Sequence, residues 1–198
     1  MPNVFTDIPE DRSDPITQTG DDEALAREAT ENPPAFAGLY RRHVNRVYRY
    51  LLARVGDVHE AEDLTAQTFL AALEGIAGYR GRGEFVAWLL GIARRKAADH
   101  FRRDRTTLPI EAAAYVPDPN PLPDAVVEQR LRLERVAQAL RGLSPDRAEA
   151  LSLRVFGGLN TADVSRVMGK SEAAVRMLVH RAVRDLRERL APVTEAER

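Results

Sequence analysis

The residues best suited to chemistry in this chain are arginines that alternate with glycines and aromatic rings. Tyr79, Arg80, Arg82 and Phe85 fall in one short stretch, YRGRGEF, and Trp88 follows at helical spacing. Guanidinium groups suit phosphates, glycines allow close backbone approach, and aromatic rings can stack on an unpaired base. This stretch is a candidate for binding single-stranded nucleic acid, although aromatic residues at helical spacing are more often core residues than platforms for a base. The alternative is that Phe85 and Trp88 belong to a hydrophobic core.

A second candidate DNA-binding pattern lies near the end of the chain, from Leu159 to Leu190. The segment LNTADVSRVMGKSEAAVRMLVHRAVRDLRERL predicts a short helix, a turn at Gly169 and a longer, Arg-rich helix. Asn160 and Ser171 are the expected N-cap residues of the two helices. This order is typical of a helix-turn-helix, whose second helix enters the major groove of DNA.

Side chains on the outer face of that second helix are the candidates for reading DNA. Glu172 and Arg176 occupy its first turns, which enter the groove first, so they are expected at base edges. His180 and Arg181 follow on the same side, and Lys170 with the helix N-terminus suits a phosphate. The alternative is a helical hairpin with a solvated arginine face.

A third group of polar residues suggests a protein partner. Glu62, Asp63 and Gln67 form a polar patch beside Phe69 on a predicted helix. An acidic patch between two basic surfaces could dock another protein, although a merely solvated face would look the same.

The elements that position these residues are all predicted to be helical. Apolar residues recur at helical spacing, and no strand-like alternation is present. Five prolines between 105 and 123 oppose helix and predict a stiff linker. The expected fold is therefore all-α, with two small helical domains joined by a Pro-rich linker, the second containing the helix-turn-helix. The expected divisions are an acidic disordered extension (1–32), a first domain (33–104), the linker (105–123), a second domain (124–192) and a tail (193–198).

The packing of the two domains stays open at this stage, because the linker is compatible with both a compact and an extended form. The role of the acidic extension stays open as well. It could screen the basic surfaces of the protein, or it could simply keep the chain in solution.

Composition excludes several classes of site. The chain has no cysteine, so disulfides and cysteine-ligated zinc are excluded. Its four histidines are scattered without metal-ligand spacing, and each is expected at or near the surface. We expect no cofactor and no metal. No signal peptide or membrane-spanning run is visible, which predicts a cytoplasmic protein that does not itself insert into a membrane.

Three segments together resemble one known family. AEDLTAQTFLAAL, YRGRGEFVAWLLGIARRKAADHFRR and LRGLSPDRAEALSLRVFGGLNTADVSRVMGKSEAAVRMLVHRAVRDL are similar to an extracytoplasmic-function sigma factor of bacterial RNA polymerase. The resemblance covers about residues 34–104 and 124–190. Several motifs agree in order and spacing, so the joint signal is more specific than any single part.

The resemblance implies a role for each group of residues. The first domain, sigma region two, would bind the polymerase clamp helices and melt the minus-ten element. The second, sigma region four, would read the minus-thirty-five element and contact the polymerase flap. An anti-sigma factor is a further expected partner. The implied residues are Glu62, Asp63, Gln67 and Phe69 for polymerase; Tyr79, Arg80, Arg82, Phe85, Trp88, Arg95, Lys96, Asp99, Arg102 and Arg103 for minus-ten DNA; and Lys170, Ser171, Glu172, Arg176, His180 and Arg181 for minus-thirty-five DNA.

Two other classes of function compete with this interpretation. A stand-alone helix-turn-helix regulator would bind duplex DNA without polymerase, usually as a symmetric dimer. The upstream arginine–glycine stretch and the lack of an obvious dimerisation helix disfavour it. An enzyme is disfavoured because no nucleophilic cysteine, metal cluster or phosphate-binding glycine loop stands out.

Overall fold

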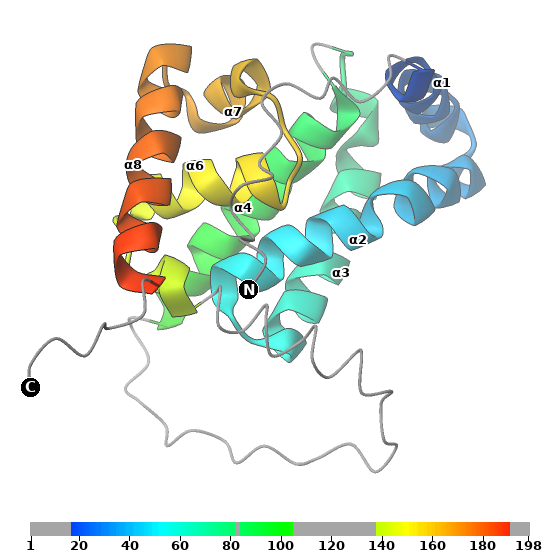
Figure 1. The fold of residues 1–198 in the computed structure, drawn as a ribbon. Helices are drawn as coiled ribbons and strands as arrows, with labels where there is room; N and C mark the ends of the chain where they lie inside the picture. Colours follow the sequence, from blue (N-terminus) through cyan, green and yellow to red (C-terminus); the bar gives the residue numbers. More distant parts are fainter. Residues whose placement is uncertain (1–16, 82–83, 105–137, 191–198) are drawn as a thin grey trace, which may run out of the picture.

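The computed structural model describes residues 17–81, 84–104 and 138–190, and the regular structure within these ranges is helical (Figure 1). Two short 3-10 turns, η1 (Pro33–Ala35) and η2 (Ile76–Gly78), accompany the α-helices. The helices are α1 (Thr17–Glu31), α2 (Phe36–Val55), α3 (Val58–Gly75), α4 (Phe85–Asp104), α6 (Pro145–Val155), α7 (Thr161–Met168) and α8 (Glu172–Leu190). The all-α fold expected from the sequence is confirmed.

The N-terminal domain, α1 to α4, is organised around α2, which packs against α1, α3 and α4. Gly56 ends α2 in the left-handed conformation, with φ 76°. Asp57 then begins α3, where its side chain accepts a hydrogen bond from Glu60 N at 3.0 Å. A sharp turn and a cap in adjacent residues bring α3 back along α2.

The N-terminal extension differs from the sequence-based expectation of disorder over residues 1–32. Residues 17–31 form α1, and Ala26 and Ala29 are buried against the core. The Asp22 carboxylate is also buried, within 2.7 Å of His43 Nε2 and 3.0 Å of Arg42 Nη1. A high content of acids suggested disorder, but two small apolar residues and one paired acid are enough to dock the helix. His43 is buried by the same contact, which corrects its expected position near the surface.

The C-terminal domain, α6 to α8, contains the predicted helix-turn-helix. Asn160 Oδ1 accepts a hydrogen bond from Asp163 N at 2.8 Å, and Ser171 Oγ accepts one from Ala174 N at 3.2 Å. Gly169 joins α7 to α8 with φ 65°, which confirms the predicted turn. An ion pair of 2.5 Å between Arg147 and Asp185 ties α6 to α8. Of the start of the expected second domain, residues 124–137 lie outside the described residues and 138–141 are helical.

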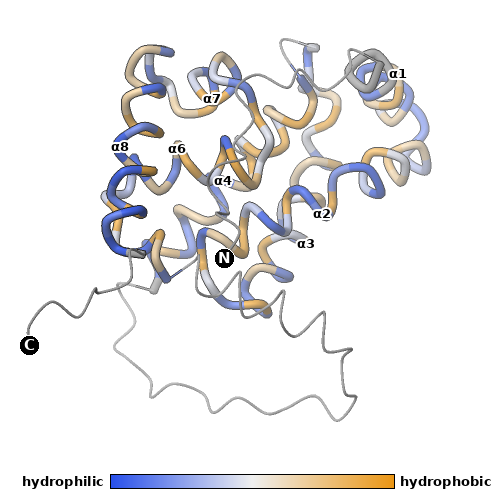
Figure 2. The backbone as a smooth tube through the Cα atoms, viewed as in Figure 1, coloured by the Kyte–Doolittle hydropathy of each residue, from blue (hydrophilic) through white to orange (hydrophobic). Residues whose placement is uncertain are grey.

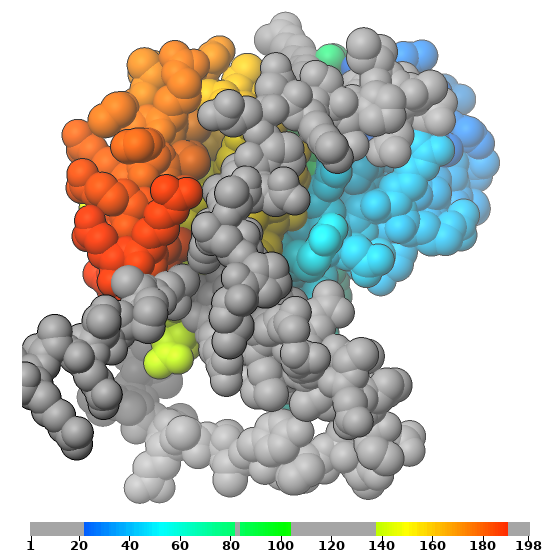
Figure 3. All heavy atoms as spheres, in the orientation of Figure 1, coloured from blue at the N-terminus to red at the C-terminus, as the bar shows by residue number. Residues whose placement is uncertain are grey.

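The two domains pack against each other, which decides the point that the sequence left open. Helix α6 contacts α2, and α7 contacts α4. One cluster of buried residues includes Leu39 and Leu89 of the first domain and Leu153, Leu159 and Val164 of the second. Hydrophobic and hydrophilic positions alternate along the helices (Figure 2). In the space-filling view α8 forms one side of the molecule, and α1 and α2 form the other (Figure 3).

Within the described ranges, no helix has the length and apolar character needed to cross a bilayer.

Candidate nucleic-acid interface

Three aromatic rings form a cluster where the arginine–glycine stretch meets α4. The ring centroids of Tyr79, Phe85 and Trp88 lie 5.3 to 5.4 Å apart. Phe85 is only 1% exposed, with the ring of His43 5.5 Å away. Phe85 was expected to contact DNA. In this structure its ring packs into the core, so that expectation is corrected. Tyr79 and Trp88 are half-buried, so part of each residue stays accessible.

The segment before α4 has the geometry of an exposed loop. Gly81 adopts φ 64°, a left-handed conformation that favours glycine. Arg80 beside it is exposed. Arg82 lies outside the described residues. An exposed arginine on a glycine turn next to two accessible rings can contact a backbone phosphate while a base stacks nearby.

The acidic helix α1 lies close to this loop and changes its electrostatics. Helix α1 packs against η2, and a Cβ on Gly81 would stand 3.8 Å from Glu23 Oε1. Burial, followed by the charges of Glu23, Asp22 and Glu84, raises the pKa of Tyr79 to about 12. Tyr79 is therefore a neutral hydrogen-bond donor at physiological pH.

The outer face of α4 carries the expected cations. Arg95, Arg102 and Arg103 are exposed, and Lys96 is half-buried. Asp99 is half-buried and accepts a hydrogen bond from Arg102 at 2.7 Å, so it orients one of these guanidinium groups. The face as a whole presents positive charge suited to a nucleic-acid backbone.

Helix α8 presents the expected recognition face to solvent. Glu172, Arg176, His180 and Arg181 are all exposed. Arg176 and Glu172 form an exposed ion pair of 3.4 Å, which an incoming base edge can replace.

The two residues before α8 complete the start of the recognition face. Ser171 caps the helix and is exposed. Lys170 is half-buried and pairs with Asp146 at 2.9 Å, so its ammonium group is engaged by α6. Met177 is 49% exposed beside Arg176.

The polar patch on α3 is exposed, but its aromatic member is not. Glu62, Asp63 and Gln67 all face solvent. Phe69 is 4% exposed and packs edge-on against Phe36. Its expected place on a polymerase-binding surface is corrected, because it lies two residues after Gln67, about 200° around the helix axis, and faces the core.

Exposed apolar side chains extend this α3 surface in a way that the sequence analysis missed. Leu70 is 58% exposed, Leu73 37% and Tyr40, from α2, 44%. Helical periodicity places Leu73 among the inward-facing residues of this helix, which its exposure corrects, and it assigns no role to Leu70. Accessibility in the folded chain was the only signal that could have separated them from core residues.

The described part of the chain contains no group of three or more His, Asp or Glu side chains able to hold a metal ion.

Comparison with known proteins places the chain in one family. Residues 39–107 match the family model of sigma-70 region 2, and residues 133–186 match that of sigma-70 region 4. Among characterised relatives, the sigma factor BldN of Streptomyces coelicolor is 41% identical over 86% of this chain, which spans 65% of that relative. The sigma factor CarQ of Myxococcus xanthus is 32% identical over 79% of this chain and 89% of CarQ.

Two solved structures share the fold. CnrH, in a complex with the cytosolic domain of CnrY, has a TM-score of 0.65 and 25% identity, covering 85% of this chain and 96% of CnrH. RpoE from Bartonella quintana, in a complex with the anti-sigma factor NepR, has a TM-score of 0.60 and 23% identity, covering 77% of this chain and 94% of that one. The chain therefore belongs to the extracytoplasmic-function group of sigma-70-type RNA polymerase sigma factors.

Proposed function

We propose that this protein is a dissociable promoter-specificity subunit of RNA polymerase, without catalysis of its own, that acts in the cytoplasm. The observation that carries the proposal is that one chain has two different surfaces, each suited to a different form of DNA. One is a loop with accessible aromatic rings beside a basic helix, and the other is a helix-turn-helix. A protein that only reads duplex DNA needs just the second.

The first surface is suited to the minus-ten element. Melting DNA costs roughly 1 to 2 kcal/mol per base-pair step. Stacking of an extruded base against Tyr79 or Trp88 offsets part of that cost. Arg80 and the outer α4 residues Arg95, Lys96, Arg102 and Arg103 bind the backbone, and Asp99 orients Arg102. Phe85 supports the two rings from the core.

The second surface is suited to duplex at the minus-thirty-five element. Arg176 and Glu172 stand in the first turns of α8, where a recognition helix reads base edges. Lys170, Ser171, His180 and Arg181 surround them and contact phosphates or neighbouring bases.

Partner proteins bind elsewhere on the chain in this proposal. The exposed face of α3, with Glu62, Asp63 and Gln67, docks on the polymerase clamp helices, and the C-terminal domain contacts the flap. In this proposal an anti-sigma factor regulates the protein. The support is that the Bartonella RpoE was solved in a complex with the anti-sigma factor NepR, and CnrH in a complex with the cytosolic domain of CnrY.

Run-off transcription tests the proposal. Purified protein is mixed with core RNA polymerase and a genomic fragment upstream of its own gene. A discrete transcript that depends on the protein is expected. Saturable binding to the same duplex without polymerase, and no transcript, would favour a stand-alone regulator instead. Because promoter choice can fail, direct binding to core polymerase is measured in parallel with the double variant Asp63→Ala/Gln67→Ala, which should bind more weakly than the wild type.

A further inference from the structure

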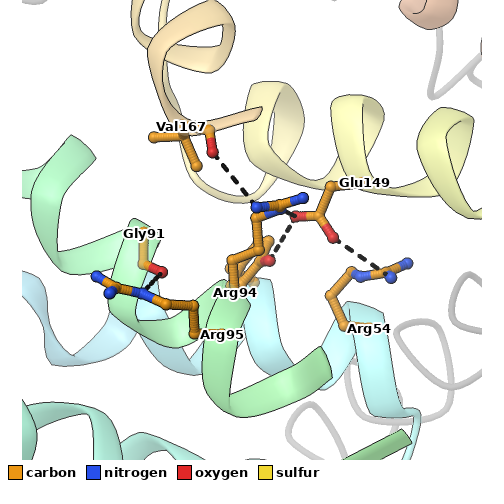
Figure 4. A network of polar contacts seen from close by, with 7 residues as sticks. Arg54, Gly91, Arg94, Arg95, Glu149 and Val167 are labelled. Carbon is orange, nitrogen blue, oxygen red and sulfur yellow. Dashed lines mark hydrogen bonds and ion pairs between the residues drawn. The ribbon is translucent and has the colours of Figure 1, made fainter. Parts of the chain in front are cut away.

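The seam between the two domains contains one buried carboxylate held by three groups from the other domain. Glu149 lies on α6, and its side chain is 11% exposed. Tyr50 Oη donates a hydrogen bond to its Oε1 at 2.6 Å, and Arg54 and Arg94 form ion pairs with it at 3.4 and 3.9 Å. Figure 4 shows Arg54 and Arg94 converging on Glu149 from two different helices. These four residues are called the Glu149 cluster below.

The donors of the cluster are themselves fixed in place. Tyr50 is fully buried, and its burial, followed by the charge of Glu149, raises its pKa well above the usual value, so it stays a donor. Arg54 lies over the ring of Phe101, 5.6 Å from its centroid. Arg94 also donates to Val167 O of α7 at 3.5 Å, so that one side chain contacts two elements of the opposite domain (Figure 4).

The stability of such a cluster depends on all of its members being present. A buried carboxylate is stable only while its partners are present, because the loss of one partner leaves an uncompensated charge out of water. When the domains separate, all the charges return to water together, so complete opening leaves no buried charge without a partner. Its remaining cost is the exposure of the apolar side chains that the two domains share, such as Leu153 and Leu90. Arg54 Nε is also buried without a hydrogen-bond partner among the described residues, which lowers the stability of the closed arrangement.

The closed arrangement is too short for the proposed function. The names of the two promoter elements place them about 25 base pairs apart, or about 85 Å along B-form DNA. A compact chain of this length has a radius of gyration of roughly 16 Å. It cannot hold both elements at once. The segment 105–137, at about 3.3 Å per residue, has a reach on the order of 100 Å, which is enough once the domains separate.

We propose that the Glu149 cluster holds the free protein in a closed state, and that polymerase and promoter DNA bind productively only after the cluster breaks. The polymerase part of this inference rests on the proposed function. The closed state leaves the recognition face of α8 exposed but occupies Arg94 of α4 with Glu149 and Val167. The free chain can therefore sample duplex DNA through its C-terminal domain, while its two DNA-reading domains are kept together.

Energy transfer within the full-length free protein tests the closed state. The chain has no cysteine, so the exposed Ala37 of α2 and Arg187 of α8 can be replaced by cysteine and labelled with a donor and an acceptor. Glu149→Gln keeps the shape of the side chain but removes its charge. We expect it to raise the ratio of open to closed molecules at least tenfold. Glu188→Gln, the same change at an exposed position on α8, should leave that ratio unchanged.

Second variants separate release of the domains from misfolding. Arg94→Gln and the more conservative Tyr50→Phe should also open the protein, and Glu149→Gln with Arg94→Gln should add little beyond Glu149→Gln alone. Helical circular dichroism reports whether each variant is folded. If the folded variants all show the transfer efficiency of the wild type, the Glu149 cluster does not hold the domains together.

Adding core RNA polymerase distinguishes this inference from the proposed function. If both are right, polymerase lowers the transfer efficiency of the wild type, and Glu149→Gln associates with polymerase faster. If Glu149→Gln opens the free protein but polymerase has no effect on either protein, the cluster is supported and the sigma-factor function fails. If polymerase opens the wild type while Glu149→Gln behaves like the wild type throughout, the function survives and the role of the cluster is overturned.

Discussion

Asp22 and His43 form a buried hydrogen-bonded pair that attaches α1 to α2. Burial by itself raises the pKa of the Asp22 carboxyl, but the hydrogen bond and charge of His43, together with those of Arg42, outweigh it and leave the pKa below its usual value. A carboxylate with a lowered pKa stabilises the folded state wherever it is ionised. The stabilisation is present above the unfolded-state pKa of about 3.9 and is lost as the pH falls through the folded-state value.

Replacing this one carboxylate should loosen α1 in a pH-dependent way. Asp22→Asn is expected to lower the free energy of unfolding by about 1 to 3 kcal/mol at pH 7, since it removes charged hydrogen bonds from a buried site. The difference from the wild type should shrink as the pH falls below about 4. Urea unfolding at several pH values measures both effects. Glu31→Gln, at an exposed position of α1, serves as control, and a constant difference across the pH range would contradict the assignment.

A single arginine is also expected to carry much of the duplex recognition. Arg176→Ala should weaken binding to the minus-thirty-five duplex by about 1 to 3 kcal/mol and relax sequence preference at one position. Arg187→Ala, an equally exposed arginine near the end of α8, should weaken binding less and without a change in preference. Fluorescence anisotropy with a set of single-base duplex variants makes the comparison. Equal losses for both variants would indicate a general charge effect instead of base recognition.

At the scale of elements, the angle between α7 and α8 depends on the left-handed residue between them. Gly169 has φ 65°, and a Cβ placed there would meet no heavy atom within 4 Å. The constraint on this position is therefore backbone conformation and not space. Gly157 is the opposite case, because a Cβ there would stand 2.6 Å from Leu153 O.

The two glycines should consequently respond differently to the same substitution. Gly169→Ala is expected to cost about 1 to 2 kcal/mol of stability, and Gly169→Asn less, because asparagine tolerates the left-handed region. Gly157→Ala should cost more than either, since backbone must move. Thermal unfolding of the three variants gives the ranking. A Gly157→Ala variant as stable as Gly169→Asn would show that the α6–α7 loop adjusts freely.

At the scale of the whole molecule, one hydrophobic cluster crosses the domain boundary. Leu153 of α6 and Val164 of α7 belong to the same cluster as Leu51 of α2 and Leu90 of α4. Unfolding of one domain should therefore lower the stability of the other. Such coupling is unusual for domains joined by a long segment.

The only tryptophan of the chain gives a direct test of that coupling. Trp88 lies in the N-terminal domain. Leu153→Ala, in the C-terminal domain, should lower stability by about 2 to 5 kcal/mol and shift the unfolding midpoint seen by Trp88 fluorescence. Met177→Ala, at an exposed position of the same domain, should leave that midpoint in place. An unshifted midpoint for Leu153→Ala would mean that the domains unfold independently.

The sequence by itself determined the local features of this protein. Its helical periodicity, the caps at Asp57, Asn160 and Ser171, and the turns at Gly56 and Gly169 all follow from preferences of single residues or of neighbours along the chain. The order of its motifs was sufficient to identify the family. The exposed arginines of the α8 face could also be placed from the helical period alone.

Only the tertiary structure decided which aromatic rings are accessible, what α1 does and how the domains meet. Phe69 and Phe85 are aromatic residues at helical spacing, as is the exposed Tyr40, and their packing in the folded chain is what separates them. Glu149 resembles any surface glutamate in the sequence. Its role arises because Tyr50, Arg54 and Arg94, distant in the chain, converge on one buried point, and no local preference encodes a contact between residues so far apart.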